Sequence, residues 1–215
     1  MVQTKSKKRI ADYGEVLTPW WLVQRVLDGL DGEGERLESR VLDLGCATGN
    51  FLVQVVERKL KAMDWNLPGV AERGLFALMN TYGVELLADN VAECRHALLA
   101  AFTETFAVED EEDFLHKAAR KVLELNIVQG DGITLKNADA DPLTLVQWRY
   151  RGGWTFTGQK YVYDLDGTER VNRHNSTNVQ NATWKPRKLG NSKEWTISTL
   201  AAGWDGLGQG GFYAI

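Results

Sequence analysis

The segment from residue 40 to residue 60 constrains the fold more than any other part of the chain. Residues 40–44, Arg-Val-Leu-Asp-Leu, form a short apolar run typical of a buried strand, and residues 45–49, Gly-Cys-Ala-Thr-Gly, form a tight turn directly after it. A helix follows, and its apolar face consists of Phe51, Leu52, Val55, Val56 and Leu60. Such a turn lets the backbone approach a ligand closely, while the helix N-terminus favours negative charge. Glycine turns also occur for purely structural reasons, so this segment alone leaves both interpretations open.

The alternation of strands and helices continues to about residue 132. Residues 18–30 predict an earlier helix, with Thr18 as its cap and Pro19 at its first position. The later elements are a strand at 82–87, a helix capped by Asp89, a helix from 114 to 123, a strand at 126–128 and a turn at 129–132. The crossover at 63–81 is long and leaves room for a short helix at 71–79. This order predicts an α/β fold with a Rossmann-like, doubly wound parallel sheet and right-handed crossovers.

The composition changes past residue 136. Helical periodicity gives way to Trp, Tyr, Gly and Asn, with alternating runs at 154–156 and 161–163. Residues 164–167, Asp-Leu-Asp-Gly, predict a hairpin turn that leads to a strand near Arg170 and Val171. We therefore divide the chain into an α/β domain at residues 1–136 and a β-rich C-terminal extension at residues 137–215.

The bulk properties limit how the chain could bind nucleic acid. A length of 215 residues suits one α/β domain with an appendage. Because the net charge is −4, any nucleic-acid-binding surface must come from a local cluster of basic residues. From Arg149 onward, nine Lys or Arg residues stand against five acids. The interleaved aromatic residues are Trp154, Tyr161, Tyr163, Trp184 and Trp195. They could form a stacking and phosphate-binding face, but an aromatic β core with solvated charges is the favoured interpretation.

The cysteines and the N-terminus predict the compartment. Cys46 and Cys94 both fall in segments with a buried pattern, which predicts free thiols in a reducing cytoplasm. Residues 1–9 are polar and basic with no apolar run behind them, so we expect neither a secretory signal nor a membrane anchor. The three histidines are scattered along the chain: His96, His116 and His174. We therefore expect a cytoplasmic protein without a metal site.

Two acids mark the ends of the second and third predicted strands. Glu85 could accept hydrogen bonds from two ribose hydroxyls. It lies 42 residues after Asp43, whereas the usual dinucleotide fingerprint places this acid roughly 20 residues after the glycine turn. Glu85 can therefore take this role only if residues 63–81 form an additional segment between the two strands. A solvated strand-end acid is the alternative for Glu85. Asp131 could accept an adenine amino group, although by itself it is better explained as a turn residue.

Together these segments resemble the amino-directed adenine DNA methyltransferases of restriction-modification systems, over roughly residues 13–135. Residues 13–19, Tyr-Gly-Glu-Val-Leu-Thr-Pro, are similar to the N-terminal segment with which that family helps to hold the methionine end of its cofactor. Residues 43–51, Asp-Leu-Gly-Cys-Ala-Thr-Gly-Asn-Phe, match the family's cofactor loop, with Ala47 where glycine is usual. Residues 82–91 and 126–131 also resemble stretches common in phage and prophage methyltransferase-like proteins.

The resemblance implies S-adenosylmethionine as the cofactor and an incomplete or modified class I methyltransferase fold. It implies that Glu85 binds the ribose and Asp131 the adenine amino group, while Leu86 and Gly132 flank the adenine ring. The full set of cofactor-binding residues that it implies is Tyr13, Thr18, Pro19, Asp43, Gly45, Cys46, Ala47, Thr48, Gly49, Asn50, Phe51, Glu85, Leu86, Asp131 and Gly132.

The family's catalytic motif is absent from this sequence. That motif, Asp or Asn followed by Pro-Pro and an aromatic residue, aims the exocyclic amine of a flipped base at the activated methyl group. The nearest stretch is residues 141–144, Asp-Pro-Leu-Thr, which lacks the second proline and the aromatic residue. A surface turn is the favoured interpretation of this stretch, and no catalytic residue is assigned.

Two functions therefore stay open at this point. One is a DNA adenine-N6 methyltransferase, or a methyltransferase-like protein, that binds double-stranded DNA through the C-terminal part. The other is a non-catalytic module that keeps the fold and binds DNA or a partner methyltransferase or restriction subunit. A third interpretation, a methyltransferase for RNA or a small molecule, requires a closed pocket above the sheet.

Overall fold

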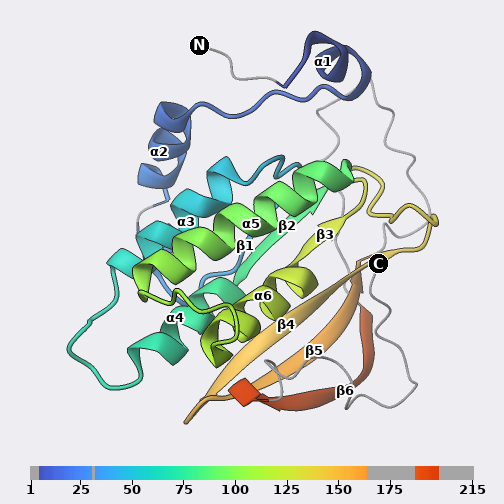
Figure 1. The fold of residues 1–215 in the computed structure, drawn as a ribbon. Helices are drawn as coiled ribbons and strands as arrows, with labels where there is room; N and C mark the ends of the chain where they lie inside the picture. Colours follow the sequence, from blue (N-terminus) through green and yellow to red (C-terminus); the bar gives the residue numbers. More distant parts are fainter. Residues whose placement is uncertain (1–4, 31, 164–186, 199–215) are drawn as a thin grey trace.

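The computed structural model describes residues 5–30, 32–163 and 187–198. In chain order the elements are α1 (Lys7–Tyr13), α2 (Trp20–Asp28), a short 3-10 helix (Glu33–Glu35), β1 (Val41–Asp43), α3 (Asn50–Lys61), α4 (Val70–Met79), β2 (Thr81–Glu85), α5 (Ala88–Thr105), α6 (Phe114–Asn126), β3 (Ile127–Gln129), β4 (Leu143–Gly152), β5 (Thr155–Tyr163) and β6 (Arg187–Thr196). Figure 1 shows α1 and α2 at the top of the molecule and the sheet of β4, β5 and β6 at the lower right. The fold is mixed α/β.

A three-stranded parallel sheet forms the centre of the α/β part. Its order is β1-β2-β3, with Val41 opposite Thr81 and Gly83 opposite Ile127. All five residues of β2 are buried, because β2 has a strand on each side and packed layers on both faces. The parallel sheet expected from the alternating pattern is confirmed for these three strands.

The long crossover between β1 and β2 is also confirmed. It contains two helices, α3 and α4, and α4 starts within one residue of the segment expected to be helical. This second helix explains why Glu85 follows Asp43 at about twice the usual spacing. Glu85 still ends β2, opposite Gln129 at the end of β3 and two residues beyond Gly83, the partner of Asp43 at the end of β1.

The start of α2 differs from the sequence prediction. The helix begins at Trp20, Pro19 occupies the N-cap position with extended backbone angles, and no side chain caps the helix. Thr18 is exposed and does not cap, so that prediction was wrong. The fixed φ of proline fits both an N-cap with extended ψ and a first helical position, and the sequence alone does not separate them.

The two faces of the parallel sheet contact different layers. Gly83 faces α3, since a Cβ built on it would lie 2.7 Å from the Cys46 Sγ and 2.9 Å from Leu52. Tyr82, the residue before it, points to the opposite face, and its hydroxyl donates to the Val146 carbonyl of β4 at 2.9 Å. The parallel sheet therefore lies between α3 and the strand β4.

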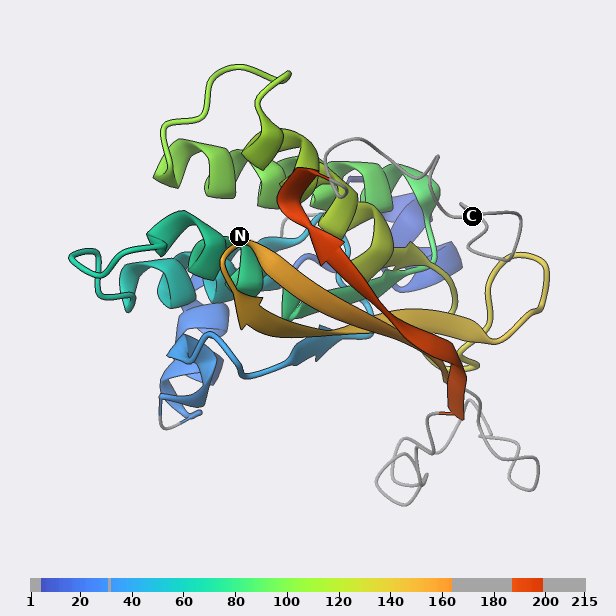
Figure 2. The same ribbon diagram turned by 90° about the horizontal axis from the view of Figure 1, so that it is seen from below.

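The C-terminal sheet is antiparallel, in the order β4-β5-β6. The two expected runs at 154–156 and 161–163 fall in one strand, β5, apart from Trp154, which lies in the turn before it. Figure 2 shows β5 between β4 and β6. The expected turn at 164–167 and strand near Arg170 lie outside the described residues. Buried side chains of β4 and β5 join the same core cluster as the helices and the parallel sheet: Leu143, Leu145, Val146, Trp148 and Phe156.

Asn126, the last residue of α6, connects the two sheets. Its side-chain amide donates to the carbonyls of Met79 and Thr81 at 2.9 and 3.1 Å, and its carbonyl oxygen accepts the indole N–H of Trp148 at 3.1 Å. The side chain is fully buried, so these polar atoms depend on protein partners. Asn126 therefore holds the start of β2 and the middle of β4 in one arrangement.

Lys59 makes a similar connection at the amino ends of β1 and β2. Its side chain is fully buried on α3, and its ammonium donates to the Ser39 carbonyl at 2.5 Å and to the Asn80 carbonyl at 3.3 Å. Ser39 and Asn80 stand just before the two strands. Burial lowers the pKa of Lys59 to about 8, because the charged form loses hydration that two carbonyls only partly replace.

We predict that Lys59 makes stability rise with pH above neutrality. The unfolded chain keeps the Lys59 proton up to a pKa of about 10.5, whereas the folded protein releases it near pH 8. The unfolded state thus binds more protons in this window, and the free energy of unfolding should increase there by up to about 1.4 kcal/mol per pH unit. Urea unfolding at a series of pH values, compared with Lys59→Met, measures the difference. If the free energy of unfolding changed with pH in the same way in both proteins, Lys59 would not be the group responsible.

Candidate cofactor site at the carboxyl ends of the parallel strands

Three loops meet where β1, β2 and β3 end. The loop after β1 is tied to β2 by a hydrogen bond from the Cys46 N–H to the Val84 carbonyl at 3.1 Å. The turn after β3 is tied to the same strand by a hydrogen bond from the Gly130 N–H to the Glu85 carbonyl at 2.9 Å. These bonds extend the strand pairing and fix both loops above the end of β2.

The loop after β1 contains two residues in the left-handed region, Ala47 with φ 46° and Gly49 with φ 91°. A Cβ built on Gly49 would lie 2.9 Å from the Cys94 Sγ, so this position packs against α5. A Cβ built on Gly45 meets nothing within 4 Å, so this position faces open space. Gly45, rather than Gly49, is therefore the glycine beside which a ligand can lie against the backbone.

Glu85 anchors this loop. Its carboxylate, in a residue only 8 % exposed, accepts the Ala47 N–H and the Leu87 N–H, each at 2.9 Å. A left-handed alanine costs roughly 1–2 kcal/mol, and a hydrogen bond to a charged group contributes roughly 1.5–3 kcal/mol. The bond to Glu85 thus offsets the strain at Ala47. A carboxylate has about four acceptor sites, so Glu85 can accept further hydrogen bonds.

Asp43 brings a second carboxylate to the same edge. Burial raises the pKa of Asp43, and the nearby charge of Glu85 raises it further, while a hydrogen bond from the Gly45 N–H opposes both effects. Two acids at the strand ends make the local potential negative. Such a site favours hydroxyl groups and positively charged groups over a diphosphate.

The loop after β3 contacts the loop after β1 at the carboxyl ends of the strands. A Cβ built on Gly132 would lie 2.1 Å from the Leu44 carbonyl oxygen, so the two loops touch through backbone. The Asp131 carboxylate accepts the Ile133 N–H at 2.8 Å, as in a local turn. Leu86 is 48 % exposed beside them. The structure thus gathers Asp43, Glu85 and Asp131 at neighbouring strand ends.

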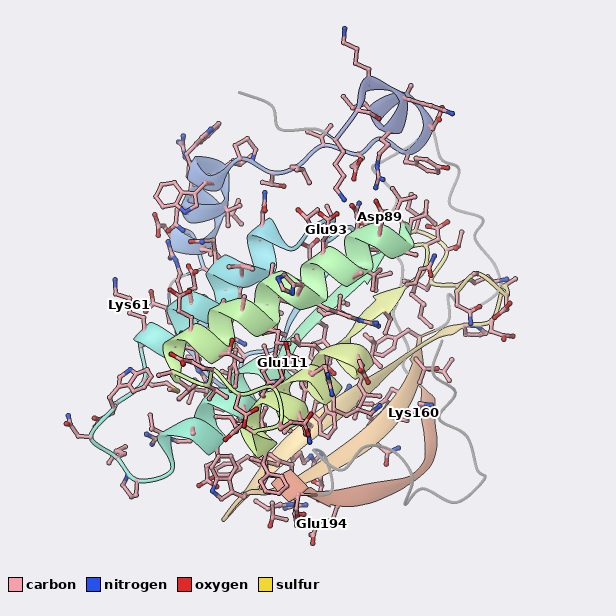
Figure 3. All side chains as sticks on the ribbon, in the orientation of Figure 1. Lys61, Asp89, Glu93, Glu111, Lys160 and Glu194 are labelled. Atoms are coloured by element: carbon pink, nitrogen blue, oxygen red, sulfur yellow. The ribbon has the colours of Figure 1, made fainter. Side chains whose placement is uncertain are left out.

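The N-terminal segment reaches the site through residues that sequence reasoning missed. Asn90 is fully buried, and its amide donates to Glu15 at 2.7 Å and to Glu85 at 3.4 Å. Arg9 donates to the other oxygen of Glu15 at 2.6 Å and also pairs with Asp89. Figure 3 labels Asp89 at the end of α5 that faces α1. The polar pair Asp89-Asn90 just after a strand end was the available signal in the sequence.

This network also sets the charge state of Glu15. Burial by itself would raise the pKa of Glu15, but the hydrogen bonds from Arg9 and Asn90 lower it overall. Glu15 therefore stays ionised and holds the N-terminal segment near Glu85. Tyr13 is 55 % exposed and Thr18 is exposed, so the segment is attached to the protein through Glu15. Both residues stay predicted cofactor contacts.

The remaining expected residues divide into inward and outward groups. Cys46 is buried, so its side chain points into the core and only its backbone is available to a ligand. Its contact with Cys94, together with burial, raises the pKa of its thiol. Phe51 packs against the core. Thr48 and Asn50 line an open hollow of about 550 Å³ with residues of α5. This hollow lies beside the loop and does not include Glu85 or Asp131.

In residues 5–30, 32–163 and 187–198, no group of three or more His, Cys, Asp or Glu side chains is placed to hold a metal ion. Within the same ranges, no helix combines the length and the apolar character that crossing a membrane requires.

We predict that Gly132 tolerates no side chain. Gly132→Ala forces a methyl group against the backbone of Leu44, so the loop after β3 must move, at a cost of roughly 1–3 kcal/mol in the free energy of unfolding. Gly45→Ala is the matched control, because its methyl group enters open space and should change stability by less than about 0.5 kcal/mol. Chemical denaturation compares the two. Equal stability of both variants would show that the loops do not touch.

No model of a known protein family matches the chain, and neither a curated protein nor a solved structure matches it.

Proposed function

We propose that the chain binds S-adenosylmethionine at the carboxyl ends of β1, β2 and β3, and that its fold is an incomplete, Rossmann-like version of the class I methyltransferase fold. The observation that carries this proposal is the contact between Ala47 and Glu85. It holds a glycine-containing loop against a strand-end carboxylate, with open space at Gly45.

The residues of the edge fit this cofactor in three respects. The backbone at residues 45–49 is free of side chains at Gly45, where the methionine part would lie. Three donors already bond to Glu85, which leaves about one of its four acceptor sites for a ribose hydroxyl. The negative potential of Asp43 and Glu85 favours the positive sulfonium and disfavours the diphosphate of a dinucleotide. When bound, the cofactor supplies an activated methyl group.

The adenine end would be held by the loop after β3. Asp131 would accept the amino group, and Leu86 and Gly132 would flank the ring. Asn90 acts as a positioning residue, since it joins Glu85 to Glu15 and so to the N-terminal segment. The tight approach of Gly132 to Leu44 sets the width available for the ring.

The substrate that we propose is adenine in double-stranded DNA, as in restriction-modification or phage methyltransferases. A non-catalytic module is the second candidate, and two observations favour it. In the described part of the chain, β1 pairs with β2 alone and Leu42 is 38 % exposed, so the sheet stops where a doubly wound sheet would continue. Asp141 lies in an exposed turn, where its N–H donates to the Asn137 side chain at 2.8 Å.

We predict that the protein binds S-adenosylmethionine and that Gly45→Ala weakens this binding by about tenfold or more, because its methyl group enters the space of the ligand. Glu85→Gln should weaken binding by a similar factor, since it removes the charge that attracts both sugar hydroxyls and sulfonium. Isothermal titration calorimetry with the cofactor and with its demethylated product measures both effects. Gly34→Ala, where a Cβ makes ordinary contacts remote from the edge, is the matched control.

Absence of heat with both ligands would reject the proposal. Equal affinity of the wild type and the Gly45→Ala and Glu85→Gln variants would reject this location of the site. Thermal unfolding of each variant confirms that a loss of binding is not a loss of fold.

Methyl transfer separates the two candidate functions. A catalytic protein transfers tritiated methyl groups from the cofactor to duplex DNA that contains unmethylated adenine. For the non-catalytic module we expect cofactor binding without transfer, and transfer restored only when a partner subunit is added. Transfer by the chain alone would exclude the module.

A further inference from the structure

A second candidate site lies at the opposite ends of the parallel strands. A cavity of about 500 Å³ opens there, within the roughly 300–1,000 Å³ typical of small-molecule sites. Leu37, Glu38 and Arg40 come just before β1, Asn80 comes just before β2, and the other walls come from α4 and β4. β2 has five residues at about 3.3 Å each, so roughly 15 Å separates this cavity from the proposed cofactor edge.

Three arginines line the cavity: Arg40 on the segment before β1, Arg73 on α4 and Arg149 on β4. The salt bridges described in the structure involve none of them. Glu38 is the only acid in the lining. In a chain with a net charge of −4, three arginines that form no salt bridge with the described residues make the lining of this cavity locally positive.

Arg73 lines the cavity and is held in place by a described hydrogen bond. One terminal nitrogen donates to the Asp64 carbonyl at 2.8 Å, which fixes the side chain. Its Nε is enclosed by protein atoms and has no hydrogen-bond partner among the described residues. Guanidinium groups match the paired oxygens of phosphate, so the other terminal nitrogen of Arg73 is the atom that could bind an anion in the cavity.

The remaining walls are aromatic and fixed in position. The Phe76 and Tyr150 rings lie 5.8 Å apart, centre to centre. The Tyr150 hydroxyl donates to the buried Glu72 of α4, and the Trp148 indole donates to Asn126. Because these contacts hold the rings in the folded protein, the cavity offers an apolar surface that needs no rearrangement to accept a flat ring.

We propose that this cavity binds a small ligand that combines a phosphate monoester with a planar ring, of the nucleoside monophosphate class. The arginines recognise the phosphate, and the Phe76–Tyr150 wall contacts the ring. A DNA backbone fits these observations less well, because the three arginines line a concave cavity, whereas duplex phosphates lie on a convex surface. This site is independent of the proposed cofactor edge, so either proposal can fail alone.

Titration of the full chain with adenosine monophosphate, and separately with inorganic phosphate, tests the proposal. We expect the nucleotide to bind more tightly than phosphate alone. Arg73→Gln and Arg149→Gln should each weaken nucleotide binding by about tenfold, since each removes one charged donor to the phosphate. Arg25→Gln is the matched control, because Arg25 is an exposed arginine of α2 that does not line the cavity, and it should leave the affinity unchanged.

The Arg149→Gln variant tests the proposal even if Arg73→Gln fails to fold. Arg149 is exposed and makes no described hydrogen bond or salt bridge, so its substitution should leave the thermal midpoint unchanged. Three results would overturn the proposal: no binding of the nucleotide at millimolar concentration, wild-type affinity in a folded Arg149→Gln variant, or nucleotide binding no tighter than that of phosphate. Binding of duplex DNA through these arginines without nucleotide binding would also overturn it.

Discussion

The hydrogen bond from the Ala47 N–H to the Glu85 carboxylate sets the shape of the strand ends. A left-handed alanine does not persist without compensation, and the buried carboxylate supplies it through a charge-assisted bond. With Ala47 fixed, Gly45 faces open space and Gly49 packs against α5. Glu85 in turn contacts Asn90, which holds Glu15 and the N-terminal segment. One carboxylate therefore organises three segments that are far apart in the sequence.

The two ends of the parallel sheet differ in charge. The carboxyl ends carry Asp43 and Glu85, whereas the amino ends lie beside Arg40, Arg73 and the buried ammonium of Lys59. A hydroxylated or cationic ligand suits the first end, and an anion suits the second. The same short strands thus separate two ends of different charge, each of which carries one of the two proposed sites.

The sequence predicted most of the α/β half because its signals are local. The apolar run before Gly45, the helix after it and the acid at the end of β2 are readable from periodicity and spacing. The contact of Gly132 with Leu44 and the burial of Asn90 were missed, since both depend on which loops meet in three dimensions. The arginine cavity was missed for the same reason, because its walls come from three separated segments. The end of the sheet at β1 was missed too, since strand order is a tertiary property.

Asn126 has a consequence for how the protein holds together. Its side chain bonds to the backbone at the start of β2 and to the indole of Trp148 in β4, so the parallel and antiparallel sheets share one buried amide. If the antiparallel sheet moved away, the oxygen of that amide would lose its only described partner in a dry environment. The C-terminal strands are therefore energetically coupled to the α/β part, and the two sheets should open together in a single cooperative transition.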